Sequence, residues 1–82
     1  MNEKFVVNNN RLYIDNKIAL TRGYCEEMKQ LEDDGYIELI VADMSDFATL
    51  YVVGVKNETI LESEKYFNLL KIAIKKGQEY NY

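Results

Sequence analysis

The chain has 82 residues, a formal net charge of −4, and 48% hydrophobic against 29% charged residues. This length suits a single domain over residues 1–82, and the composition is too apolar for an intrinsically disordered protein. The longest apolar runs fall far short of the ~20 residues that a membrane helix needs. The first residues also lack the basic and apolar regions of a secretion signal. We therefore expect a cytoplasmic protein with no membrane contact.

Three short strands are predicted in the first twenty residues. Apolar residues cluster at 5–7, 12–14 and 18–20, and runs rich in asparagine and aspartate separate these clusters. Asparagine tolerates the left-handed backbone that tight hairpin turns require. The pattern predicts an N-terminal hairpin or meander.

A helix is predicted over residues 21–34. Thr21 is a suitable N-cap, because its hydroxyl can accept from an unpaired amide of the first turn. Gly35 supplies the positive φ that commonly ends a helix. The predicted apolar stripe consists of Tyr24, Met28 and Leu31.

Two strands are predicted to follow, over residues 36–42 and 48–55, with a hairpin loop at 43–46. The first alternates with a period of two, as a strand does. The second carries branched and aromatic residues on both faces. We expect this second strand to lie inside the sheet.

A second helix is predicted from a capping box at Thr59 and Glu62 to Lys76, just before Gly77. Its main core face would contain Ile60, Tyr66, Phe67, Leu70, Ala73 and Ile74. A second apolar stripe lies well away from that face on the helical wheel and consists of Leu61, Leu69 and Ile72. This stripe indicates either a self-association surface or a two-sided core.

These elements predict an α+β fold in two layers. The order is hairpin, helix, hairpin, C-terminal helix, and the connections are short. A mostly antiparallel sheet with both helices on one face satisfies that order.

Acidic residues concentrate in the middle of the chain. Residues 22–46 contain eight acids against Arg22 and Lys29, whereas the flanking segments are each close to neutral. Some of these acids occupy the last turn of the predicted helix, where the macrodipole disfavours anions. The predicted partner-binding residues are Glu26, Glu27, Asp33, Asp34, Tyr36, Glu38, Asp43 and Asp46. The alternative is an ordinary solvated face.

Most site chemistries are disfavoured. The chain has no histidine, no glycine-rich phosphate loop and no pair of cysteines. Asp43 and Asp46 lack the further ligands of a calcium loop and suit a turn without metal. Cys25 suits a small buried side chain. We expect no catalysis, metal or cofactor, and a pI of about 4.7 argues against direct nucleic-acid binding.

In size, charge and composition, the chain is similar to small inhibitor proteins of phages and mobile elements, such as anti-CRISPR or anti-restriction proteins. That similarity implies an acidic protein that binds a basic surface of a protein partner, such as a nucleic-acid-binding protein. The alternative hypothesis is a dimeric structural or regulatory domain that self-associates through Leu61, Leu69 and Ile72.

Overall fold

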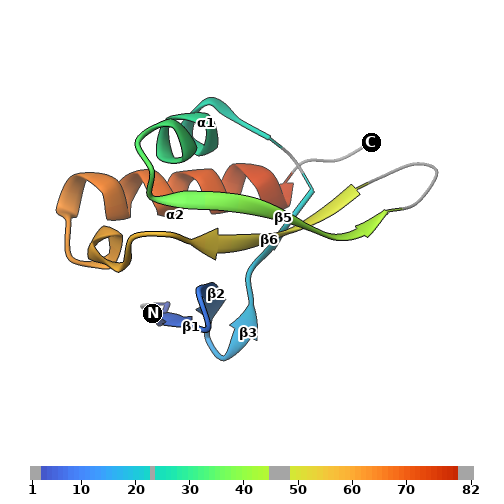
Figure 1. Ribbon diagram of the computed structural model, residues 1–82, viewed down its shortest axis with the longest axis horizontal. Helices are drawn as coiled ribbons and strands as arrows, with labels where there is room; N and C mark the ends of the chain where they lie inside the picture. The colour runs from blue at the N-terminus through green and yellow to red at the C-terminus, as the bar shows by residue number, and fades with distance from the viewer. Residues whose placement is uncertain (1–2, 23, 45–48, 80–82) are drawn as a thin grey trace.

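The computed structural model describes residues 3–22, 24–44 and 49–79, and it confirms the α+β class. Six strands form one sheet in which every pairing is antiparallel. Two α-helices and a short 3₁₀ helix complete the fold (Figure 1). The elements are β1 (Phe5–Asn8), β2 (Arg11–Ile14), β3 (Lys17–Ile18), β4 (Leu20–Thr21), α1 (Glu26–Asp33), β5 (Ile37–Met44), β6 (Thr49–Val55), η1 (Glu58–Leu61) and α2 (Glu64–Glu79).

The predicted N-terminal meander is confirmed. Strand β2 pairs with β1 on one side and with β3 on the other. Both connecting turns have two consecutive residues with positive φ, namely Asn9 and Asn10 in the first turn, and Asp15 and Asn16 in the second. Positive φ at both central residues is what a type I′ turn requires, and Asn and Asp tolerate it better than most residues do.

The third predicted strand divides into β3 and β4 at Ala19. The Ala19 amide donates to the Leu12 carbonyl of β2, whereas the Ala19 carbonyl accepts from Val53 of β6. The chain therefore leaves β2 at Ala19 and joins β6. Strand β6 pairs with β5 along one edge and with β2 and β4 along the other, so it lies inside the sheet as expected.

The first helix is shorter than predicted. Thr21 is a buried residue of β4 rather than the N-cap, and α1 begins at Glu26 after Cys25. Tyr24 precedes the helix and is 55% exposed, which leaves Met28 and Leu31 as its buried residues. The prediction failed because Thr21 satisfies a capping pattern locally, but pairing with β6 extends the chain there.

The second helix differs from its prediction at both ends. Residues 58–61 form the separate 3₁₀ helix η1, whose first turn is capped by Asn57, and not by a Thr59–Glu62 box. Helix α2 begins at Glu64. The hydroxyl of the preceding residue, Ser63, accepts from the Tyr66 amide at 3.3 Å. At its other end α2 continues through Gly77 to Glu79.

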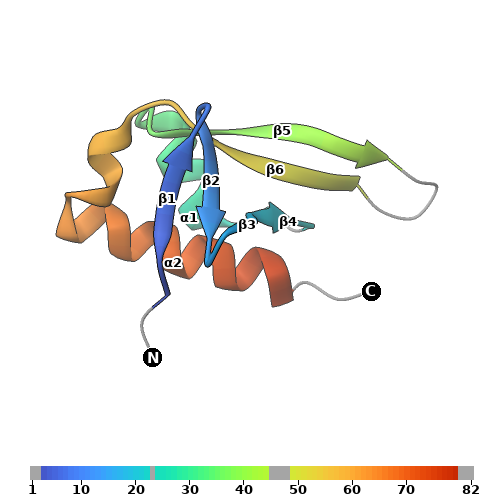
Figure 2. The same ribbon diagram turned by 90° about the horizontal axis from the view of Figure 1, so that it is seen from below.

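The core lies between the helices and one face of the sheet. Leu12, Met28, Leu31, Ile37, Val53, Val55, Ile60, Leu70, Ala73 and Ile74 are buried in it, with Ala19 at its margin. The core face predicted for the second helix is therefore confirmed. Helix α2 lies along the sheet, and β1 and β2 cross the direction of this helix (Figure 2). Phe5 of β1 packs edge-on against Phe67 of α2, with 5.0 Å between ring centroids.

Gly77 allows α2 to approach β4 closely. A Cβ atom at this position would overlap the Thr21 hydroxyl and lie 2.7 Å from the Met28 Cε. The Gly77 carbonyl also accepts from the Arg22 amide. The glycine is thus required for helix–strand packing and not for ending the helix.

Candidate interaction surface

Of the predicted acids in α1, two are exposed and two are paired with a lysine, and Asp33 belongs to both groups. Glu26 and Asp33 are exposed, while Glu27 is half-buried and points toward α2. Lys76 of α2 donates to the Glu27 carboxylate at 2.9 Å, and Lys29 donates to Asp33 at the same distance. Exposed pairs of this kind contribute little to stability, but each reduces the local negative charge.

These contacts shift the pKa values of the paired groups. The hydrogen bond from Lys76 lowers the pKa of Glu27, and the same contact raises the pKa of Lys76. The hydrogen bond to Asp33 likewise raises the pKa of Lys29. Glu27 is therefore engaged within the fold and contributes less to an outward acidic surface than the sequence predicts.

Tyr36 and Asp34 belong to one contact at the C-terminal end of α1. Tyr36 stacks on Tyr66 of α2 with ring centroids 4.3 Å apart. The Tyr66 hydroxyl donates to the Asp34 carboxylate at 3.3 Å, and the negative charge of Asp34 raises the pKa of Tyr66. Tyrosine is enriched at protein interfaces, whereas acidic residues are depleted there and suit the polar rim, so Tyr36 and Tyr66 are the interface-like residues of this contact.

The predicted acids of the second hairpin lie apart from those of α1. Glu38 is exposed on the sheet face opposite the helices, since its neighbours Ile37 and Leu39 face the core. Asp43 is exposed near the end of β5, after a β-bulge at Ala42. Asp46 lies outside the described residues. The structure therefore does not gather all the predicted residues on one surface.

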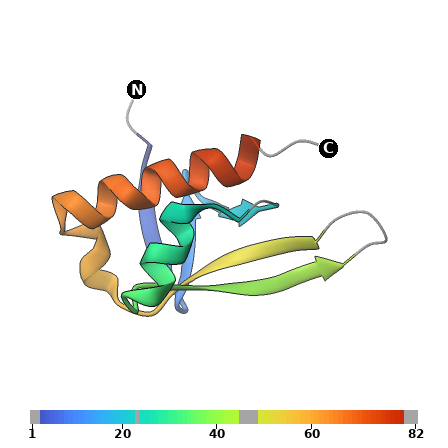
Figure 3. The same cartoon turned by 90° about the horizontal axis from the view of Figure 1, so that it is seen from above.

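Three exposed acids outside the predicted set lie in η1, directly after it and at the start of α2, namely Glu58, Glu62 and Glu64. The Tyr36 carbonyl accepts from the amides of Lys56 and Asn57, which joins the chain just after α1 to the chain just before η1 at one end of the molecule (Figure 3). We define the acidic end as Asp33, Asp34, Glu58, Glu62 and Glu64, which are all exposed. Lys29, Lys56 and Lys65 are the basic residues near it. The signal for them in the sequence is their spacing, since Glu58, Glu62 and Glu64 fall within seven residues at and before the start of α2.

The predicted self-association stripe is mostly covered within the molecule. Leu61 and Leu69 are half-buried and pack against the core, whereas Ile72 is 44% exposed. This arrangement corresponds to the two-sided core that the stripe also allowed. Self-association through these residues stays a prediction.

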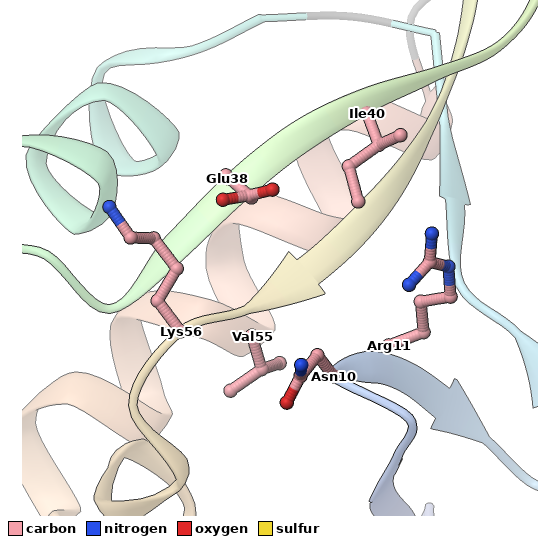
Figure 4. A pocket seen from close by; sticks show the side chains of 6 residues that line it. All are labelled: Asn10, Arg11, Glu38, Ile40, Val55 and Lys56. Carbon is pink, nitrogen blue, oxygen red and sulfur yellow. The ribbon is translucent and has the colours of Figure 1, made fainter.

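A surface hollow of about 370 Å³ lies on the sheet face opposite the helices. It is lined by Asn10, Arg11, Glu38, Ile40, Val55 and Lys56. Arg11 and Lys56 lie on either side of Glu38 (Figure 4). Glu38 and Lys56 are exposed, so water competes with any ligand there, and we assign none to the hollow.

The described residues show neither a metal site nor a membrane helix. Within residues 3–22, 24–44 and 49–79, no three metal-binding side chains converge. Cys25 is half-buried, and its Sγ lies 4.0 Å from the Ala73 carbonyl oxygen. None of the helices described is long and apolar enough to span a membrane.

Comparisons with known proteins identify no relative of the chain. No protein-family model, curated protein or solved structure gives a significant match to the chain.

Proposed function

We propose that the protein is a small, non-enzymatic interaction protein of the cytoplasm whose acidic end binds a basic surface of a protein partner. A partner that itself binds nucleic acid would be inhibited, because the same basic surface contacts phosphate. This is the mode of action expected of the phage and mobile-element inhibitors that the chain resembles in size and charge.

One observation carries the proposal. Asp33, Asp34, Glu58, Glu62 and Glu64 are exposed, and Asp34 accepts from the hydroxyl of Tyr66, whose ring stacks on Tyr36. Tyrosine supplies contact area at a low cost in conformational entropy, while the surrounding carboxylates attract a basic surface. The two kinds of side chain together favour protein binding over a merely solvated helix face.

Charge reversal tests the proposal. Asp33→Lys combined with Asp34→Lys should abolish capture of a partner from cell lysate, compared with the unaltered protein. Glu3→Lys is the control, because it makes the same kind of charge change at an exposed position outside the acidic end. Equal capture of every partner by the double variant and the unaltered protein would contradict the proposal.

A further inference from the structure

No described strand pairs with the outer edge of β5. In the described sheet β5 pairs only with β6. The amides of Val53 and Val55 donate to Ala19 and Asn10, and so they point away from β5. Because hydrogen-bonded and non-hydrogen-bonded pairs alternate in an antiparallel ladder, the remaining residues of β6 bond to β5.

The same alternation determines which β5 groups point outward. Ile37, Leu39 and Val41 lie opposite Val55, Val53 and Tyr51 in the register. These are non-hydrogen-bonded pairs, so the three β5 residues direct their N–H and C=O groups away from β6. A neighbouring extended chain would find alternate donors and acceptors along this edge.

This edge carries little of the protection that natural edge strands have. Strand β5 contains no lysine and no proline, and only the bulge at Ala42 interrupts it. The last residues of β5 and the first residues of β6 project beyond both helices (Figures 1 and 3). Val41 is 52% exposed there, and Met44 is 72% exposed.

The charge along the edge indicates what kind of chain would fit. Residues 32–44 contain five acidic side chains and no basic one. Glu38 is exposed on one face of β5, whereas Leu39 and Val41 offer apolar contacts on the other. A second copy of the chain would bring the same acids together, while a basic segment would be complementary to them.

We infer that the β5 edge binds an extended segment of a protein partner in which lysine or arginine alternates with apolar residues. This inference rests on the proposed function and adds the mode of binding. The apolar residues of the segment lie opposite Leu39 and Val41, and their backbone groups form hydrogen-bonded pairs with these two residues. The basic residues lie on the other face, beside Glu38.

Two capped peptides of alternating lysine and valine test the inference. The second peptide is N-methylated at its valines, which keeps the charge but removes the amides that would face β5. The unmodified peptide should slow hydrogen exchange at the Leu39 and Val41 amides, and the methylated peptide should not. Equal binding of both peptides would show attraction by charge alone, which overturns strand addition but leaves the proposed function intact.

A proline variant gives an independent test on the protein. Val41→Pro removes one outward N–H without removing a hydrogen bond between β5 and β6, and should weaken peptide binding about tenfold. Val7→Pro is the matched control. The Lys4 carbonyl accepts from the Asp15 amide, so Lys4 and Asp15 form a hydrogen-bonded pair. Hydrogen-bonded and non-hydrogen-bonded pairs alternate along β1, and Val7 therefore belongs to a non-hydrogen-bonded pair. Its amide points away from β2, toward the free edge of β1.

Two further outcomes would overturn the inference. The first is that neither peptide binds at low salt, and in that case the lysate capture still decides the proposed function separately. The second is that Leu39 and Val41 become protected as protein concentration rises without peptide. That result would identify a second copy of the chain as the occupant of the edge.

Discussion

At the scale of single residues, Gly77 has the most restrictive environment. In most helices, alanine is more favourable than glycine by ~1 kcal/mol. Here Gly77→Ala should instead destabilise the protein by about 1–3 kcal/mol, because the added Cβ would overlap Thr21 and crowd Met28. Urea unfolding measures the difference, with the exposed residue Lys75 changed to alanine as the control. An unchanged or raised unfolding free energy for Gly77→Ala would show that α2 can move away from β4.

Tyr24 offers a titration at the same scale. Its hydroxyl donates to the Glu32 carboxylate at 2.5 Å, and this hydrogen bond, followed by burial and the nearby negative charge, raises the pKa of Tyr24 to about 12. Glu32→Gln should return that pKa toward 10, as measured by NMR of the tyrosine ring. Glu26→Gln serves as the control, because Glu26 is not among the groups that shift this pKa.

The same pKa shift has a defined effect on stability. The unfolded chain loses the Tyr24 proton near pH 10, whereas the folded chain retains it until about pH 12. The stabilising contribution is therefore fully present below pH 10 and is lost as the pH rises toward 12. In Glu32→Gln the dependence of unfolding free energy on pH over this interval should become weaker. An identical dependence in both proteins would show that the contact does not form in solution.

At the scale of elements, the hairpin turns provide a clear test. The turn between β2 and β3 has positive φ at Asp15 and Asn16. Asn16→Gly should leave stability unchanged or raise it by up to ~1 kcal/mol, since glycine adopts positive φ without strain. Asn16→Val should lower it by about 1–2 kcal/mol, because a branched side chain clashes in that conformation. Urea unfolding of both variants checks the sign, and a neutral valine variant would contradict the turn geometry.

The elements also show what the sequence could and could not predict. The turns at Asn9 and Asp15 depend on their own residues, and so they could be predicted locally. Thr21 and Gly77 have the local features of an N-cap and a helix end, but they are in fact packed against one another across 56 positions of the chain. That contact depends on the tertiary fold, which no local pattern contains.

In the candidate site, too, local features could be predicted from the sequence and tertiary contacts could not. The acidic content of residues 22–46 could be read from the sequence, whereas the pairing of Glu27 with Lys76 could not, because it joins α1 to the far end of α2. The acids of η1 and α2 seemed to be balanced by nearby lysines. In the fold Lys75 and Lys76 lie toward the far end of α2, because a helix of 16 residues places its two ends ~24 Å apart, whereas Lys56 and Lys65 stay near the acids.

At the scale of the whole molecule, this separation makes the two ends of α2 electrostatically different. Glu58, Glu62 and Glu64 lie at and before its N-terminus, and Lys75 and Lys76 lie near its C-terminus. This order suits the helix macrodipole, although Lys65 and Glu79 depart from it. If that order served helix stability alone, neutralising either end would have similar effects on partner binding. The proposed function requires instead that only the acidic end matters.

Neutralising pairs of charges distinguishes these cases. Glu58→Gln with Glu62→Gln should weaken capture of the lysate partner by about twofold to tenfold, because each removes a carboxylate facing the basic surface. Lys71→Gln with Lys75→Gln, a matched pair on α2 outside the acidic end, should leave capture unchanged or strengthen it. Raising the salt from about 0.1 M to about 1 M shortens the screening length from about 10 Å to about 3 Å and should reduce the difference between the variants. Equal loss of capture by both pairs would show that binding does not depend on the acidic end, and that the charge order of α2 serves the helix itself.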